Sequence, residues 1–278
     1  MTRMARMARL LALPTLLLFL ATAGGCSARK ATAPPRTQEA WKQLFNGTSL
    51  AGWQPQVDGL PLGQDPSRVF SVREGTIHAY AASKTTETVP FGFLATTNEY
   101  ENFALSFEFR WGEKKFPPRA TEKRDAGLLF FVHGQSKVWP RCVELQVQEG
   151  DTGDIFTVGT VVETTVNPTS IKKGPISSAA YLPADRRGVA HAQGGLGITR
   201  IVKLKNTERA GWNTVLLEAH GDEAVYRVNG VVVNRFRALR TVESDGGHRV
   251  LSRGKVALQA EGAEVMYRNI KIRSLDPL

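Results

Sequence analysis

The feature that most constrains the fold is an alternation of apolar and polar side chains with a period of two residues. In residues 103–110 every odd position is Phe or Leu, whereas Glu108 and Arg110 occupy even positions. Residues 142–148 alternate in the same way, with Val and Leu at the odd positions after Cys142. This period is typical of a β-strand that buries one face, and helical periodicity is nearly absent from the chain.

Further strands are predicted at residues 126–133, 157–165, 199–205, 213–220, 223–228, 231–236, 254–261 and 264–273. Asn229-Gly230 predicts a two-residue hairpin turn, because both residues tolerate positive φ. Residues 112–125 and 167–198 are rich in charged residues, Gly or Pro and predict long loops. Many strands with few helices predict an all-β fold in which two antiparallel sheets pack as a sandwich.

The N-terminus predicts export. Arginines precede an apolar run at residues 10–21, which is followed by small residues and then Cys26. This order predicts a lipoprotein signal peptide at residues 1–25, since the apolar run is too short to span a membrane. Lipid would be attached to the Cys26 sulfur; the alternative is an ordinary signal peptide with a chance cysteine. We expect a location in the bacterial cell envelope, on the outer membrane because Ser27 follows the cysteine.

Residues 26–40 have the composition of a flexible tether, which leaves residues 41–278 as one domain. The net charge is +10, but the basic residues are scattered and an exported protein rarely meets nucleic acid. We therefore expect no nucleic-acid partner, and membrane contact only through the lipid anchor. With Cys26 in the anchor, Cys142 has no disulfide partner and is expected to be a small buried residue.

Several sequence blocks resemble those of one family. They read FNGTSLAGW at 45–53, FSVREGTI at 70–77, EYENFALSFEFR at 99–110, AGLL at 126–129 and GKVALQAEGAEVMYRNI at 254–270. In this order they resemble the 3-keto-disaccharide hydrolase domain family. The resemblance implies a concanavalin-like jelly roll, a carbohydrate substrate and cleavage of glycosides already oxidised to a ketone at C3.

The resemblance covers residues 41–274, nearly the whole predicted domain. Residues 139–154 are similar to a subset of the family with the pattern E-x-Q-x-Q-x-G-D-x-G-D. A ketone at C3 acidifies the hydrogen on C2, so cleavage by elimination needs one base, one acid and donors for the enolate. It does not need the two carboxyl groups that flank C1 in an ordinary retaining glycosidase.

Glu144 is the candidate base. It shares one face of its strand with Gln146 and Gln148, and a buried glutamine needs hydrogen-bond partners. Gln259 and Glu261 share a face of another strand. The alternative for both groups is a solvated sheet face or edge. Laminarinase-like jelly rolls carry further acidic residues at the positions of Gln146 and Gln148. We therefore favour keto-glycoside cleavage over ordinary glycoside hydrolysis.

His133 at a strand end is a second candidate, which could be the acid partner of Glu144 in place of Glu261. Arg110 and Arg268 are candidates to bind hydroxyl groups or an enolate, or to form structural salt bridges. Trp139 could stack on a sugar ring, or anchor its loop before Pro140.

Asp151 and Asp154 could contribute oxygen ligands to a divalent metal such as calcium. Two aspartates beside a glycine are more typical of a turn, so the sequence favours a turn over a metal site and predicts no other cofactor. Two other functions remain open for the domain: a sugar-binding module without catalysis, and a scaffold of an envelope complex.

Overall fold

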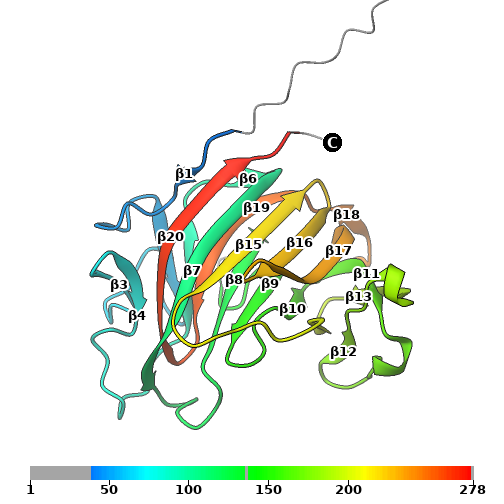
Figure 1. The fold of residues 1–278 in the computed structure, drawn as a ribbon. Helices are drawn as coiled ribbons and strands as arrows, with labels where there is room; N and C mark the ends of the chain where they lie inside the picture. The colour runs from blue at the N-terminus through cyan, green and yellow to red at the C-terminus, as the bar shows by residue number, and fades with distance from the viewer. Residues whose placement is uncertain (1–38, 135–136, 277–278) are drawn as a thin grey trace, which may run out of the picture. The chain divides into compact units, whose positions relative to one another are not determined.

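Two β-sheets make up the computed structural model, which describes residues 39–134 and 137–276 (Figure 1). The described residues fall in one unit, Gln38–Leu278. The predicted signal peptide, Cys26 and nearly all of the predicted tether lie outside them. Within the described part of the chain, no helix has the length and apolar character needed to cross a membrane.

The larger sheet has eleven strands. Nine of them form a continuous order: β13 (Val189–Gly194), β11 (Thr160–Val166), β17 (Val231–Val242), β16 (Glu223–Val228), β15 (Asn213–His220), β7 (Phe103–Lys115), β20 (Ala263–Ser274), β4 (Thr76–Ala79) and β3 (Phe70–Arg73). Two short strands pair at its sides: β1 (Lys42–Gln43) with β20, and β18 (His248–Val250) with β17.

The smaller sheet has nine strands. Eight of them follow the order β12 (Ser177–Ala180), β14 (Ile198–Val202), β10 (Ile155–Val158), β9 (Arg141–Gln148), β8 (Asp125–His133), β19 (Arg253–Ala260), β5 (Gly92–Thr96) and β2 (Trp53–Val57). The ninth, β6 (Tyr100–Glu101), pairs with β19. Pairing is antiparallel except between β12 and β14. Two short 3-10 helices, η1 (Pro168–Ser170) and η2 (Ala184–Arg186), lie near β12 in the chain.

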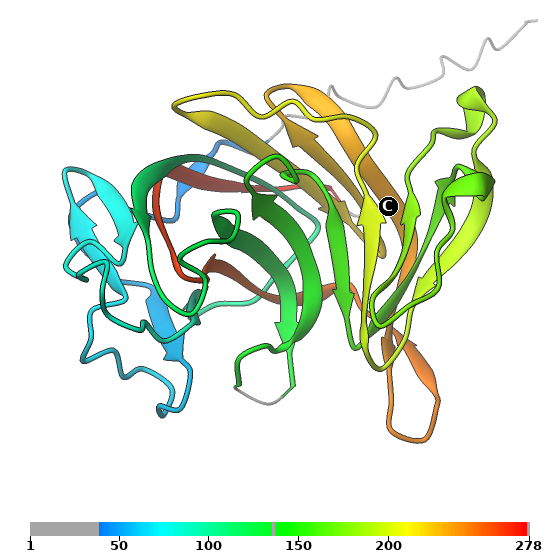
Figure 2. The same cartoon turned by 90° about the horizontal axis from the view of Figure 1, so that it is seen from below.

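The core lies between the two sheets, which form separate layers in Figure 2. The apolar positions of β7 and β9 point into it: Phe107, Phe109, Val143 and Leu145 are fully buried. The alternation in the sequence is therefore confirmed as the pattern that sorts core from surface. Burying each such side chain contributes about 1.5–3 kcal/mol.

The predicted hairpin at Asn229-Gly230 is confirmed, with φ of 51° and 80° at the two residues. The prediction of one strand at 157–165 was wrong. Gly159, with φ of 62°, ends β10, and β11 then crosses to the other sheet.

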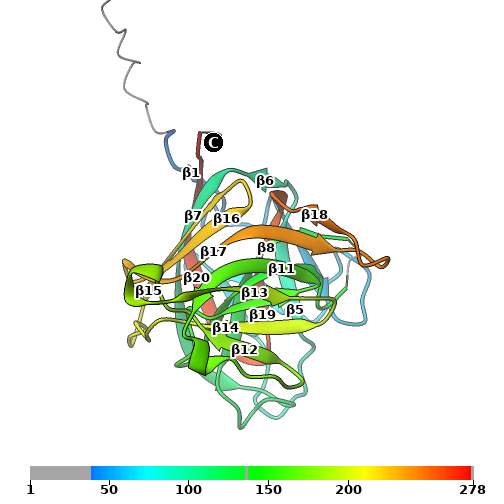
Figure 3. The same cartoon turned by 90° about the vertical axis from the view of Figure 1, so that its right-hand side faces the viewer.

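The prediction of a loop at 167–198 was also wrong. This region holds β12 and β13, which lie at the ends of the two sheets and face the viewer in Figure 3. Edge strands built from Ser, Ala, His and Gln bury few side chains, so they lack the apolar alternation that identifies a strand. The region predicted as a loop at 112–125 likewise starts inside β7, which runs to Lys115.

Candidate functional site

The outer face of the smaller sheet carries a group of polar side chains across β8, β9 and the end of β19. We call this group the polar face; it consists of Asp125, Glu144, Gln146, Gln148, Gln259 and Glu261. The alternation of β9 places its three members on one side, because Val143, Leu145 and Val147 fill the core on the other. Strand register then aligns Gln146 with Gly127 and Gln148 with Asp125.

Gly127 makes room for two of these side chains. A Cβ atom at this position would lie 2.6 Å from Oε1 of Glu144 and 2.8 Å from Oε1 of Gln259. Real Cβ atoms are not found so close to other heavy atoms, so any larger residue would displace the pair. The two oxygens therefore lie together over a strand position without a side chain, and Glu144 and Gln259 share a hydrogen bond.

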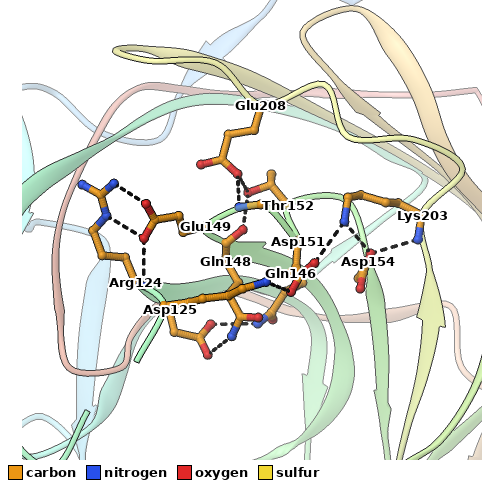
Figure 4. Close-up of polar contacts among 12 residues, drawn as sticks. Arg124, Asp125, Gln146, Gln148, Glu149, Asp151, Thr152, Asp154, Lys203 and Glu208 are labelled. Carbon is orange, nitrogen blue, oxygen red and sulfur yellow. Dashed lines mark hydrogen bonds and ion pairs between the residues drawn. The ribbon is translucent and has the colours of Figure 1, made fainter. Parts of the chain in front are cut away.

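Asp125 holds the neighbouring amides. Its Oδ1 accepts a hydrogen bond from Nε2 of Gln146 at 2.7 Å, and its Oδ2 accepts one from Nε2 of Gln148 at 2.5 Å (Figure 4). Oδ2 also lies 2.8 Å from Nη2 of Arg119. The same guanidinium contacts Glu261 through Nη1, so one cation is shared between two carboxyl groups of the polar face.

This shortage of cations shifts the acidity of the carboxyl groups. Burial, followed by the nearby charges of Glu261 and Asp125, raises the pKa of Glu144 well above its usual value. Burial and Asp125 raise the pKa of Glu261 to about 8, although Arg119 opposes the shift. Burial raises the pKa of Asp125 to about 6, against the effect of Arg119. Near neutral pH the cluster therefore holds both a proton donor and a proton acceptor.

An apolar patch adjoins the polar face. Phe93, Ala95, Leu129, Cys142 and Ala257 form a small cluster on the outer side of the smaller sheet, and Trp139 packs against it. Trp139 also stacks on Phe91, with ring centroids 6.3 Å apart and planes 17° apart. Cys142 is fully buried here, as predicted. An aromatic surface beside hydrogen-bonding groups suits a sugar, which has apolar ring faces and polar edges.

The structure does not bring His133 to Glu144. It pairs in register with Arg141, which shares the strand face of Val143 and therefore points away from Glu144. Its Nδ1 lies 2.9 Å from the carbonyl oxygen of Phe131, and it lines a separate pocket of about 500 Å³ with Arg141 and Glu243. Burial lowers the pKa of His133. The expectation that it is the acid partner of Glu144 is not supported by this geometry.

Arg110 and Arg268 also lie away from the polar face. They belong to β7 and β20 of the larger sheet, where both guanidinium groups cover the Trp212 ring at 5.0 and 3.8 Å. Nε of Arg268 donates to Glu108 at 2.7 Å. The two arginines therefore make structural contacts on the outer side of the larger sheet, which was the alternative to a role in sugar binding.

Asp151 and Asp154 are neutralised by cations in the turn after β9 (Figure 4). Nζ of Lys203 lies 3.4 Å from Asp151 and 3.3 Å from Asp154, and Arg200 contacts both carboxylates. A metal would have to displace these partners. Across residues 39–134 and 137–276, no group of three or more His, Cys, Asp or Glu is placed to hold a metal ion.

Sequence reasoning missed Arg119, Asp125, Phe91 and Gly127. Asp125 could have been found, because pairing the predicted strands at 126–133 and 142–148 places it opposite Gln148. Arg119 lies in a charged stretch where nothing distinguishes it from its neighbours. A further pocket of about 710 Å³ is lined by Tyr181 and Arg235 among others, and no residue of the polar face lines it.

Comparison with known proteins identifies the family. The model of the 3-keto-alpha-glucoside-1,2-lyase-like domain matches residues 40–273. Two solved structures from Parabacteroides distasonis, each described as a candidate glycosyl hydrolase, share the fold. One is 19% identical, with a TM-score of 0.50 over 85% of this chain and 94% of its own. The other is 17% identical, with a TM-score of 0.50 over 85% and 100%.

No curated protein matches the chain. The family match covers most of the chain and agrees with the jelly-roll arrangement of the two sheets. The protein thus belongs to the family of 3-keto-alpha-glucoside-1,2-lyase-like domains, as a jelly roll that acts on or binds carbohydrate.

Proposed function

We propose that the protein cleaves 3-keto-glycosides by elimination across C1 and C2, with Glu144 as the base and Glu261 as the proton donor. The observation that carries this proposal is the pairing of two carboxyl groups with raised pKa on one sheet face, with a single shared arginine between Glu261 and Asp125. The raised pKa keeps Glu261 protonated near neutral pH, and it makes Glu144 a stronger base in its ionised form, whose population grows as the pH rises.

In this reaction the ionised carboxylate removes the hydrogen on C2, which the C3 ketone has made acidic. The C2–H and C1–O bonds break, a C1=C2 double bond forms, and the leaving oxygen takes a proton from the acid. Trp139 and Phe91 would support the sugar ring from one side. Water can add to the enone afterwards, which would make the overall reaction a hydrolysis.

The test is to incubate the full-length protein with a chromogenic 3-keto-glucoside and with its unoxidised parent, with and without divalent metal. We expect chromophore release from the keto substrate alone, and a loss of about 10²–10⁴-fold in Glu144→Gln. Glu108→Gln is the matched control, because Glu108 is a strand carboxylate paired with Arg268 on the other sheet. Equal loss in both variants, or release from the unoxidised parent, would refute the proposal.

We also propose that the domain is held in the bacterial envelope by lipid on Cys26. Radiolabelled fatty acid should be incorporated into the wild-type protein in cells and not into Cys26→Ser. Labelling of Cys26→Ser at the wild-type level would contradict the anchor.

A second candidate is carbohydrate binding without catalysis. It is favoured by two buried acceptor oxygens, Oε1 of Gln146 and Oε1 of Gln259, which have no hydrogen-bond partner within the described residues. A binding module would retain affinity for unmodified glycosides in Glu144→Gln and would release no chromophore.

A further inference from the structure

Asp125 is a carboxylate that the proposed reaction does not use. Its side chain is only 4% exposed, at the base of the polar face. An ionised carboxylate can only accept hydrogen bonds. Because Gln146 and Gln148 both bond to Asp125 through their side-chain amides, the nitrogen of each amide must face the carboxylate (Figure 4). The chemistry of Asp125 therefore fixes which way these two amides point.

The carbonyl oxygens are consequently the ends turned away from Asp125. Gln146 is 4% exposed and its Oε1 accepts no hydrogen bond from the described residues. Gln259 is 1% exposed, bonds to Glu144, and also leaves its Oε1 without a partner. Leaving a buried acceptor unsatisfied costs roughly 1–3 kcal/mol, so both oxygens are suited to accept from a bound ligand. Hydroxyl groups are the donors that a sugar offers.

We propose that Asp125 is a positioning residue that makes the polar face a hydrogen-bond acceptor for sugar hydroxyl groups, by fixing the amide orientation of Gln146. A ketone oxygen, which only accepts hydrogen bonds, finds no donor at Oε1 of Gln146 and must bind elsewhere in the site. This inference rests on the proposed function for the identity of the ligand. It assigns different partners to the hydroxyl and keto groups of the same sugar.

Asp125→Asn tests this assignment with almost no change in shape. Arg119 donates toward Oδ2, so an acceptor must remain at that position. The new amide nitrogen then takes the place of Oδ1 and faces Gln146. Gln146 must turn its own amide to present Oε1 to the asparagine, and its N–H groups would point toward the ligand. A hydroxyl donor would meet a donor, and binding would weaken.

The wild-type protein allows a test without mutation. Protonation of Asp125 as the pH falls through about 6 adds a donor beside Gln146 and removes the constraint on its amide. The charged groups that face Asp125 are Arg119 from the preceding loop, Glu261 at the end of β19 and Glu144 on β9. Glu261 titrates near 8, above this range. Sugar affinity should therefore fall as the pH drops below about 6.

The experiment has two readouts on the full-length protein. The first is the NMR signals of the side-chain amides, assigned to Gln146 by their loss in Gln146→Asn and followed against pH without any sugar. The second is the affinity for methyl glucoside and its 3-keto form, measured by calorimetry. We expect the Gln146 signals to shift with a midpoint near 6 in the wild type and not in Asp125→Asn, and affinity for methyl glucoside to fall about tenfold or more in the variant. Gln148→Met, which leaves the contact between Gln146 and Asp125 in place, should retain the Gln146 titration.

Gln146 signals that do not respond to pH near 6 would overturn the inference, as would wild-type affinity in Asp125→Asn. A different result would refute only the proposed function. In that case sugar binding would depend on Asp125, but the keto substrate would release no leaving group. The amide titration decides the orientation of Gln146 even if Asp125→Asn fails to fold.

Discussion

Glu144 and Glu264 are both strand glutamates that lie over a glycine of a neighbouring strand. A Cβ at Gly127 would meet Glu144, and a Cβ at Gly112 would overlap Glu264. Glu264 is well supplied with donors: Nε2 of His78 lies at 2.9 Å, and the backbone N–H groups of Glu113 and Lys114 lie at 3.2 and 3.3 Å.

The acidity of the two groups differs accordingly. Burial alone would raise the pKa of Glu264, but the hydrogen bonds from His78 and the Lys114 backbone lower it on balance. Burial and two neighbouring carboxyl groups raise the pKa of Glu144 instead. The same steric arrangement therefore gives an ionised carboxylate with hydrogen-bond donors in one sheet, and in the other a carboxyl group that burial and neighbouring charges keep protonated. A carboxyl group whose pKa is shifted in this way is a candidate functional group.

The largest effect is expected from Gly112→Ala. The added methyl group would displace Glu264 from its donors and leave a buried carboxylate with poor partners. We expect a loss of about 3 kcal/mol in the free energy of unfolding, which denaturant titration measures. A loss below about 0.5 kcal/mol would show that Glu264 is no anchor.

Gly127→Ala should act on function instead. The methyl group would move the ends of Glu144 and Gln259, both flexible side chains, by about 1 Å, and such a displacement can reduce turnover about 100-fold. The free energy of unfolding should change by less than in Gly112→Ala. Steady-state kinetics with the keto substrate, together with denaturant titration, compare the two variants. The comparison fails if Gly127→Ala is the less stable of the two.

Glu144→Gln should increase stability while it reduces turnover about 10²–10⁴-fold. The folded-state pKa of Glu144 is raised, so stability falls as the pH rises above the pKa of the unfolded chain, where the glutamate ionises in the unfolded chain but keeps its proton in the native state. The neutral glutamine avoids this cost, on the order of 1 kcal/mol at pH 7. The gain should disappear as the pH falls below about 4, where the unfolded chain also binds the proton. Thermal unfolding across pH measures it, and a lower melting temperature at pH 7 would contradict it.

Glu264→Gln should show the opposite pH dependence. A lowered folded-state pKa contributes stability above the pKa of the unfolded chain, and this contribution is lost as the pH falls through the folded value. We expect the variant to be about 1 kcal/mol less stable than the wild type at pH 7 and nearly equal to it at low pH. A gap that persists unchanged at low pH would mean that the carboxylate charge is not its source.

The smallest effect is expected from Arg268→Ala, which removes a stacking and ion-pair contact on the outer side of the larger sheet. Such exposed contacts contribute about 0.5–1 kcal/mol. Turnover should equal that of the wild type, which separates this face from the polar face. A loss of turnover with unchanged stability would return Arg268 to the candidate site residues.

The sequence predicted the strands whose apolar side chains alternate, because burial of one face requires that pattern. It did not predict β12 and β13, because few side chains of these edge strands are buried and an apolar alternation is not required there. It also placed Glu144 and Gln146 on one face from period alone. It could not show that His133 points the other way, because the irregular pairing between Phe130 and His133 shifts the register near the strand end. Arg119 reaches the site from a loop, and no periodic rule applies there.

The place of β19 in the smaller sheet affects the order in which the protein can fold. This strand, Arg253–Ala260, lies between β8 and β5, which precede it in the chain by more than a hundred residues. Those two strands cannot join one sheet until the C-terminal part of the chain has been made. Pairing over such sequence distances is slow, because loop-closure entropy is lost before the contacts form. Gln259 lies on this strand and Glu261 directly after it, so a nascent or truncated chain lacks both an interior strand of the smaller sheet and two of the six residues of the polar face.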